Sequence, residues 1–170
     1  MKLKNLGYSF VLLILLSSLL SPTNRVLAAS IIYANENGLI SGTCNNWTNA
    51  CDLQYAITIS TQGDEIWLMQ GTYYPTVGVD RTISFVMKDD VSLYGGFLGI
   101  ETQRDERSTD ASFTILIGNI GLEGDPTDNS YHVVISNGTT NATVLSGFTI
   151  TAGYANGVAQ HSFGAGMYND

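Results

Sequence analysis

The sequence has few charged residues, few prolines and only two cysteines. Of its 170 residues 13% are charged and three are proline, whereas 18 are glycine. This composition argues against an intrinsically disordered chain and against a long coiled coil, because both are rich in charge. Lys and Arg number seven against fifteen Asp and Glu, a net charge of -8. A nucleic-acid partner is therefore not expected, since phosphate binding requires clustered Lys and Arg. No catalytic constellation is found.

The segment 1–29 is typical of a secretory signal peptide. A basic start at Lys2 and Lys4 precedes an apolar run over 10–20, and the small residues Ala28 and Ala29 provide a cleavage site. The run is too short to cross a bilayer, which requires about 20 residues; a retained anchor helix is the alternative. Cleavage would leave four basic and fifteen acidic residues, a net charge of -11. We therefore expect a secreted, extracellular or cell-surface protein without a membrane span after cleavage.

Export makes a disulfide between Cys44 and Cys51 the favoured interpretation of the two cysteines. A separation of seven residues allows a loop to bring the two Cα atoms within bonding distance in an oxidising compartment. A metal site is less favoured, because only two thiols are present and both histidines are distant in sequence. A catalytic thiol is weaker still, since no nearby basic residue would lower its pKa.

One short helix is predicted directly after the cysteine loop, over residues 52–60. Leu53, Ala56, Ile57 and Ser60 follow the i, i+3, i+4, i+7 spacing of a single helix face. Asp52 or Asn49 can cap its start. A short helix with a single apolar face, followed directly by a strand, suggests that the helix covers another element of the fold.

The rest of the chain predicts short strands separated by Gly, Asn and Asp. The strand predictions rest on β-branched and aromatic content and cover six segments: 65–69, 82–86, 91–94, 113–117, 132–135 and 147–151. Apolar pairs lead into Gly95, Gly118 and Gly147, and the spacing of these glycines suits one turn of a solenoid. A sandwich with Asn-Gly hairpins remains an alternative.

Several motifs run in order over residues 31–170. They include Asp52-Leu53-Gln54, Gly63-Asp64-Glu65-Ile66-Trp67-Leu68, Leu93-Tyr94-Gly95-Gly96-Phe97 and Gly164-Ala165-Gly166-Met167-Tyr168-Asn169. Together they resemble the secreted bacterial right-handed parallel β-helix proteins of the pectin-lyase-like superfamily. The resemblance implies an all-β fold, a right-handed parallel β-helix or solenoid with a short N-terminal capping α-helix.

This fold would divide the chain into three parts. They are a signal peptide (1–29), an N-terminal strand with the Cys loop and capping helix (30–63), and the first coils of the β-helix (64–170). Because the resembling proteins continue with further coils, we expect a fragment; a small solenoid sealed by a dimer partner is the alternative. The residues expected to point inward are Ile66, Leu68, Phe85, Leu93, Ile115, Ile117, Val133, Ile135, Phe148 and Ile150.

Candidate sites are few. Glu123, Asp125 and Asp128 offer oxygen ligands for calcium, although their spacing is not that of a defined calcium loop. No other cofactor is expected. Asp89 and Asp90 resemble the paired acids of glycosidases, but their place between two strands favours a solvated turn.

The remaining candidates are basic and aromatic residues. Arg104 or Arg107 could hold a sugar carboxylate, but a salt-bridge network with the neighbouring acids is favoured. His132 and His161 have no partner close in sequence, so each is expected to be packed or solvent-facing. A sugar-stacking platform could form from Trp47, Trp67, Tyr73 and Tyr74, with Trp67 more simply placed against the helix.

The sequence therefore supports two alternative functions. The catalytic residues, if there are any, are unknown. The favoured one is a structural, adhesin-like or carbohydrate-contacting scaffold, without chemistry in this portion. The alternative is the N-terminal part of a polysaccharide lyase or glycoside hydrolase whose active residues lie beyond Asp170. The expected partners are polysaccharides or cell-surface components.

Overall fold

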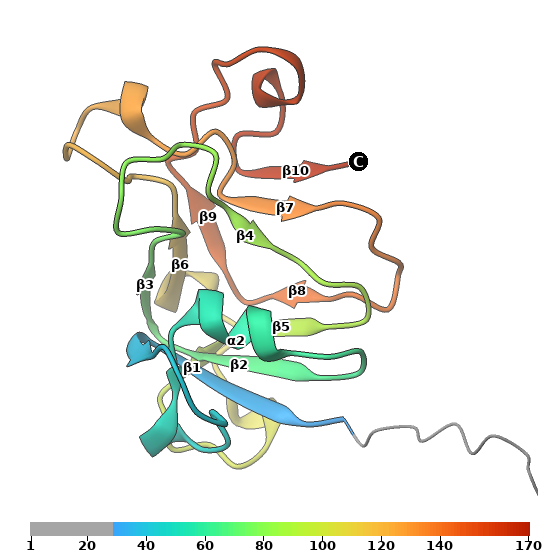
Figure 1. The fold of residues 1–170 in the computed structure, drawn as a ribbon. Coiled ribbons are helices and arrows are strands. Elements are labelled where there is room, and N and C mark those ends of the chain that lie inside the picture. The colour runs from blue at the N-terminus through green and yellow to red at the C-terminus, as the bar shows by residue number, and fades with distance from the viewer. Residues whose placement is uncertain (1–28) are drawn as a thin grey trace, which may run out of the picture.

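The structure is a computed structural model that describes residues 29–170 (Figure 1). The predicted signal peptide therefore lies outside the described residues, apart from Ala29. The predicted boundary at residues 63 and 64 stays a prediction. Strand pairing crosses it, because β1 before this point pairs with β2 after it.

The strands form three small sheets in which all pairs are parallel. The first sheet has the order β1-β2-β5-β8, with the bounds Ile31–Leu39, Glu65–Met69, Ser92–Phe97 and Leu145–Ser146. The second has the order β3-β6-β9, with Gly71–Tyr73, Thr114–Ile117 and Thr149–Thr151. The third has the order β10-β7-β4, with Met167–Asn169, Val134–Ser136 and Phe85–Val86.

The expected fold class, an all-β right-handed parallel β-helix with a capping helix, is wrong. The described residues form three separate small parallel sheets, with 16% of residues helical and 29% in strands, and no solenoid or closed sheet. The physical reason is that β-branched content and glycine spacing locate strands and turns, but do not specify how sheets assemble. The sandwich alternative is also wrong, because no strand pair within 29–170 is antiparallel and Asn37-Gly38 lies inside β1.

Individual strands were predicted better than their assembly. Each of the six predicted segments overlaps a strand, and the segment 65–69 has the bounds of β2. The N-terminal strand expected before the Cys loop is present as β1. The strands β3, β8 and β10 were not predicted, and each is only two or three residues long. Such short segments carry too few residues for a visible alternating pattern.

The predicted helix is confirmed as α2, Leu53–Ile59, with Asp52 as its N-cap. The Asp52 carboxylate accepts a hydrogen bond from the Tyr55 backbone N–H at 3.2 Å. The predicted face is buried: Leu53, Ala56, Ile57 and Ser60 are all at most 6% exposed. The helix packs against β1, β2 and β4. The other helical elements are single 3-10 turns: η1 Trp47–Asn49, η2 Arg104–Glu106, η3 Ala111–Phe113, η4 Pro126–Asp128 and η5 Ala159–Ser162.

Apolar side chains from neighbouring strands form rows in the core. Register places Ile32, Ile66 and Leu93 side by side in the first sheet, and all three are buried. The prediction that side chains point into the core is confirmed for Ile66, Leu68, Phe85, Leu93 and Val133, which are all buried. In β6 it is wrong by one residue, because Leu116 is buried whereas Ile115 and Ile117 are only partly buried. Since side chains alternate along a strand, a shift of one residue exchanges the two faces.

The same one-residue shift affects β7, where Val134 is buried and Ile135 only partly. Phe148 and Ile150 are partly buried and pack against the core. A close backbone contact joins Gly95 to Gly147: a Cβ at Gly95 would overlap the Gly147 carbonyl oxygen. Any larger residue at position 95 would therefore push these two segments apart.

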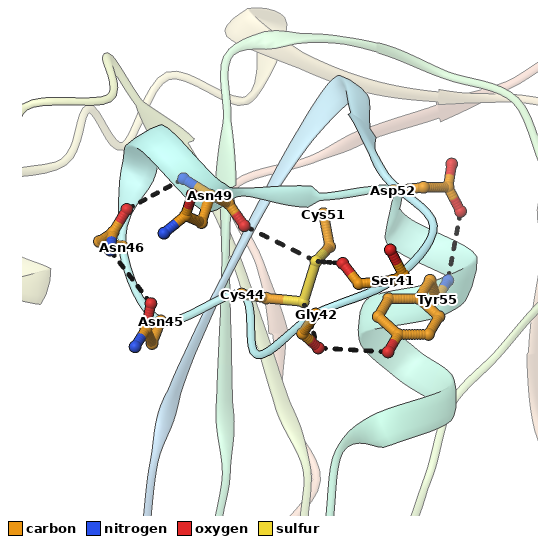
Figure 2. Close-up of a disulfide and its surroundings, with 9 residues drawn as sticks. All are labelled: Ser41, Gly42, Cys44, Asn45, Asn46, Asn49, Cys51, Asp52 and Tyr55. Atoms are coloured by element: carbon orange, nitrogen blue, oxygen red, sulfur yellow. Dashed lines mark hydrogen bonds between the residues drawn. A yellow bond between two sulfur atoms is a disulfide. The ribbon is translucent and has the colours of Figure 1, made fainter.

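The predicted disulfide is present between Cys44 and Cys51, with a Cα–Cα distance of 5.4 Å (Figure 2). Both cysteines are fully buried. Asn46 caps η1 inside the loop, and the Tyr55 hydroxyl of α2 donates a hydrogen bond to the Gly42 carbonyl at 3.2 Å. The bridge and this bond fasten the Cys loop to the start of α2.

Candidate functional site

The strongest candidate site is a pocket on the third sheet, where β7 and β10 meet η5. It is a partly open cavity of about 310 Å³, lined by His132, Ile135, Asn137, Gln160, His161, Tyr168 and Asp170. Pairing of Tyr168 with Ile135 brings β10 beside β7. The return of the chain from β7 to β10 thus brings His132 and His161 together.

The two histidines form a hydrogen-bonded pair. His132 is 1% exposed, and its Nδ1 lies 3.1 Å from the Gly164 carbonyl oxygen. A carbonyl only accepts, so Nδ1 of His132 carries a proton. His161 Nδ1 lies 3.3 Å from Nε2 of His132, and a hydrogen bond joins the two rings.

Aromatic rings flank the pair on both sides. The Tyr131 ring stacks on His161 with centroids 4.5 Å apart, and Tyr168 lies 5.0 Å from His132. Burial raises the pKa of the Tyr168 hydroxyl, and the Asp170 carboxylate raises it further. The Tyr168 hydroxyl is therefore neutral at ordinary pH.

Arg81 supports the site from behind Tyr131. Its guanidinium lies 4.1 Å from the Tyr131 ring centroid, a cation–π contact. The same side chain donates to the Asn129 carbonyl at 2.6 Å and to the Tyr154 carbonyl at 2.8 Å. Arg81 therefore joins the loops that contain Asn129 and Tyr154, and its Nε and Nη2 groups donate within the protein.

The predicted calcium ligands do not form a metal site in the structure. No group of three or more His, Cys, Asp or Glu residues within 29–170 is arranged to hold a metal ion. Asp125 accepts from the Thr127 hydroxyl at 2.6 Å and backbone at 2.9 Å, and these bonds lower its pKa. Asp128 accepts from the Leu122 N–H at 2.7 Å. The Asp125 and Asp128 carboxylates thus organise their own turn around η4.

Asp89 and Asp90 form the turn that the sequence favoured. Asp89 accepts from both the backbone N–H and the hydroxyl of Thr140 at 2.8 Å, and these bonds hold its pKa below the usual range. Asp90 has a left-handed backbone with φ of 56°. The Asp89 carboxylate is thus used to join two loops.

Arg104 and Arg107 do not form the expected salt-bridge network with the acids next to them in the sequence. Arg104 forms an ion pair with Glu65 at 2.5 Å, outside the cluster, and donates to the Tyr94 hydroxyl at 3.2 Å. Arg107 donates to the Gly95 carbonyl and the Ser146 hydroxyl, both at 3.0 Å. The acids Glu101 and Glu106 instead accept backbone N–H groups, so the loop is closed by capping rather than by salt bridges.

Glu101 is the main capping acid. It is 7% exposed and accepts from the N–H groups of Leu98, Gly99 and Ile100 at 2.7 to 3.0 Å. Burial alone would raise its pKa, but these backbone hydrogen bonds outweigh burial and lower it. The Glu101 carbonyl also accepts from the Trp47 indole at 2.9 Å, which links this loop to the Cys loop.

The proposed aromatic platform does not form. Trp67 is buried and stacks on Phe97 at 4.6 Å, not on α2 as expected. Tyr73 is buried too, with its hydroxyl donating to the Met69 carbonyl at 2.7 Å. Burial raises the Tyr73 pKa, and the carboxylates of Glu36 and Asp52 add to this. Trp47 belongs with Trp67 to the cluster around Phe97, whereas Tyr74 is 49% exposed.

The pairing of the histidines was not predicted, nor was the role of five other residues: Arg81, Tyr131, Asn137, Gln160 and Tyr168. One available signal was the sequence separation of His132 and His161, which is similar to that of the strand partners Val134 and Met167. That signal becomes visible only when β7 and β10 are known to pair.

Comparison with protein families finds no matching model, and comparisons with curated proteins and with solved structures find no match. The family resemblance in the sequence motifs therefore stays a prediction. None of the helices within 29–170 has the length and apolar character needed to cross a membrane. The disulfide fits an extracellular setting.

Proposed function

We propose that the protein is an exported scaffold that binds a carbohydrate in the His132–His161 pocket without reacting with it. The proposal combines the signal-peptide pattern of residues 1–29 with the Cys44–Cys51 disulfide and the pocket. Disulfides persist in oxidising compartments. The ligand would then be a polysaccharide or another cell-surface component.

The observation that carries the proposal is the combination of ring faces and polar edges in one partly open cavity. Tyr168 and His161 provide rings, while Asn137, Gln160 and Asp170 provide amide and carboxylate groups. A sugar presents apolar C–H faces and a rim of hydroxyls, so it matches both kinds of surface. The volume of about 310 Å³ suits a small ligand or one unit of a chain.

Charge narrows the class of sugar. The chain carries a net charge of -8, and Asp170 adds a carboxylate to the pocket itself. The pocket lining contains no Lys or Arg, and Arg81, which packs on Tyr131, is engaged with Asn129 and Tyr154. An acidic sugar would thus meet repulsion without a free cationic partner, so a neutral or amino sugar is favoured.

A calorimetric titration with neutral, amino and acidic oligosaccharides tests this proposal. We expect binding of the neutral or amino members, and at least a tenfold loss of affinity in Tyr168→Ala. Tyr74→Ala is the matched control, because Tyr74 is exposed and lines a different cavity. No binding by any member would refute the proposal, and equal loss in both variants would remove the pocket from it. Shortened oligosaccharides would instead support a lyase or hydrolase.

A further inference from the structure

Two neighbouring cavities lie along the loop between β6 and β7, which Figure 1 shows beside the loop between β3 and β4. The first, of about 380 Å³, is lined by residues that include Asp125 and Asn129, and we call it the acidic cavity. The second, of about 370 Å³, is lined by both loops, and we call it the apolar cavity. Asn119 lines both cavities, so they adjoin. Neither shares a lining residue with the His132–His161 pocket.

The acidic cavity contains oxygen acceptors that the chain does not use. The Thr127 N–H and hydroxyl both donate to Oδ1 of Asp125, at 2.9 and 2.6 Å, so Oδ2 is not engaged by them. Asn129 is 5% exposed, and its buried Oδ1 has no hydrogen-bond partner within 29–170. Buried polar atoms are nearly always hydrogen-bonded, so this oxygen indicates a donor from outside the chain.

An ammonium group suits the acidic cavity better than a metal ion does. A calcium ion takes about six to eight oxygen ligands, and no group of three or more His, Cys, Asp or Glu residues within 29–170 could hold a metal. An ammonium group has three donors and no acceptor, so one carboxylate and one or two neutral oxygens satisfy it. The cavity therefore matches the end of a Lys side chain.

The apolar cavity is bounded by a loop with exposed apolar side chains. Val77 is fully exposed, Val79 is 73% exposed and Tyr74 is 49% exposed. Ile120, which is buried, lines the same cavity, and none of the lining residues is charged. Exposed apolar groups that gather around a cavity mark an interaction site. An apolar side chain of a partner would cover them.

Charge decides which kind of partner fits these two loops. Residues 74–80 and 118–126 contain the three acids Asp80, Glu123 and Asp125 and no Lys, Arg or His. The whole chain has a net charge of -8. An acidic partner would therefore be repelled, whereas a basic one is attracted. Charge and exposed apolar surface together favour a partner that carries both basic and apolar side chains.

We propose that the two cavities form a docking site for an extended, basic segment of a partner protein. A Lys side chain of this segment would donate from its ammonium group to Asp125 Oδ2 and Asn129 Oδ1 in the acidic cavity. A neighbouring apolar side chain would pack against Val79 and Ile120 in the apolar cavity. The Asn119 amide, which can both donate and accept, would bond the peptide unit between them. This site is separate from the proposed carbohydrate pocket, so the inference does not depend on the proposed function.

Fluorescence anisotropy of a labelled peptide with repeated Lys-Ser-Leu-Ser units, titrated with the full, oxidised chain, tests the docking site. In an extended peptide the Lys and Leu side chains of this repeat lie on one side. We expect saturable binding with a dissociation constant below about 0.1 mM. A peptide with Glu in place of Lys, or with Ser in place of Leu, should bind at least about tenfold more weakly.

Two pairs of variants locate the binding. Asp125→Asn removes the charge but keeps an oxygen for Thr127, and it should raise the dissociation constant at least about tenfold. Asp105→Asn is its matched control, because it makes the same charge change at an exposed acid of another loop. Val79→Ser should weaken binding at least about fivefold, whereas Ile100→Ser, at a site that is 78% exposed after β5, should not.

Circular dichroism verifies that each variant is folded. If Asp125→Asn does not fold, a nuclear magnetic resonance titration of the wild type with the Lys-Ser-Leu-Ser peptide replaces it. The backbone N–H signals of Gly124 in the acidic cavity and Gly78 in the apolar cavity should shift, and that of Gly138 should not.

Three results would overturn the proposal. One is the absence of saturable binding up to about 0.1 mM. Another is equal weakening by Asp125→Asn and Asp105→Asn, because the peptide would then respond only to the overall charge of the chain. The third is equally tight binding of the peptide with Ser in place of Leu, which would leave the apolar cavity without a role.

Discussion

Replacing Glu101 should open the loop that follows β5. Its Oε1 accepts from Leu98, and its Oε2 accepts from both Gly99 and Ile100. Gln keeps one acceptor oxygen, so Glu101→Gln leaves either one or two of these N–H groups without an acceptor. At about 1.5–3 kcal/mol for each hydrogen bond to a charged group, the loss of one or two bonds should lower the free energy of unfolding by about 1.5–6 kcal/mol.

Urea unfolding at pH 7, followed by tryptophan fluorescence, measures this loss, since Trp47 donates to the Glu101 carbonyl. Asp105→Asn is the matched control, because Asp105 is an exposed acid of the same loop. The control should change stability by less than about 0.5 kcal/mol. An equal effect of both variants would refute the capping role of Glu101.

Glu101 should also make the stability of the protein depend on pH. The folded-state pKa of Glu101 lies below its unfolded value of about 4.3, so its stabilisation is present above that pH and is lost as pH falls through the folded-state pKa. The gap between wild type and Glu101→Gln should therefore narrow below about pH 4. A gap that stays constant from pH 7 to pH 3 would contradict a charged carboxylate at this position.

Three further predictions concern the core and the bridge. Leu116→Ala should cost about 2–5 kcal/mol because Leu116 is fully buried, whereas Leu122→Ala at an exposed site should change urea unfolding little. Reducing Cys44–Cys51 should cost about 2–3 kcal/mol for so short a loop, and a melting temperature unchanged by reductant would contradict this. The raised pKa of Tyr73 means that its stabilisation is complete below its unfolded pKa of about 10 and is lost as pH rises above it. Alkaline unfolding curves should thus depend on pH less steeply in Tyr73→Phe than in the wild type.

Local features of the fold could be predicted from the sequence because a single segment determines each of them. The face of α2, its Asp52 cap and the strand β2 follow from residues that are neighbours in the chain. The disulfide was also predicted, because a short separation between the two cysteines allows few other arrangements. Periodicity and capping act over a few residues, so they are visible without knowledge of the assembly.

The assembly could not be predicted in the same way. The inward residue of β6 was misplaced because Thr114-Ile115-Leu116-Ile117 is apolar on both faces, so its pattern does not select a face. The solenoid was inferred from motifs, whereas the structure has three separate sheets. Which strands meet is decided by contacts between distant residues, and a single sequence contains no direct signal for those contacts.

The candidate site was missed for a related reason. His132 and His161 are far apart in the sequence, and they meet only because β10 returns beside β7. The acids that the sequence singled out, Asp89 and Asp125, are instead bound to Thr140 and Thr127. A carboxylate beside a turn is visible in the sequence, but its hydrogen-bond partners decide whether it remains available for a ligand.

The most direct test of carbohydrate binding in the pocket is a nuclear magnetic resonance titration of labelled protein with a neutral oligosaccharide. We predict saturable shifts of the His132 and His161 ring signals and of the side-chain amides of Asn137 and Gln160, all of which line the cavity. The side-chain amide of Asn46 in the Cys loop should not move. Unchanged histidine signals at saturating sugar, or shifts confined to residues outside the cavity, would contradict the proposed site.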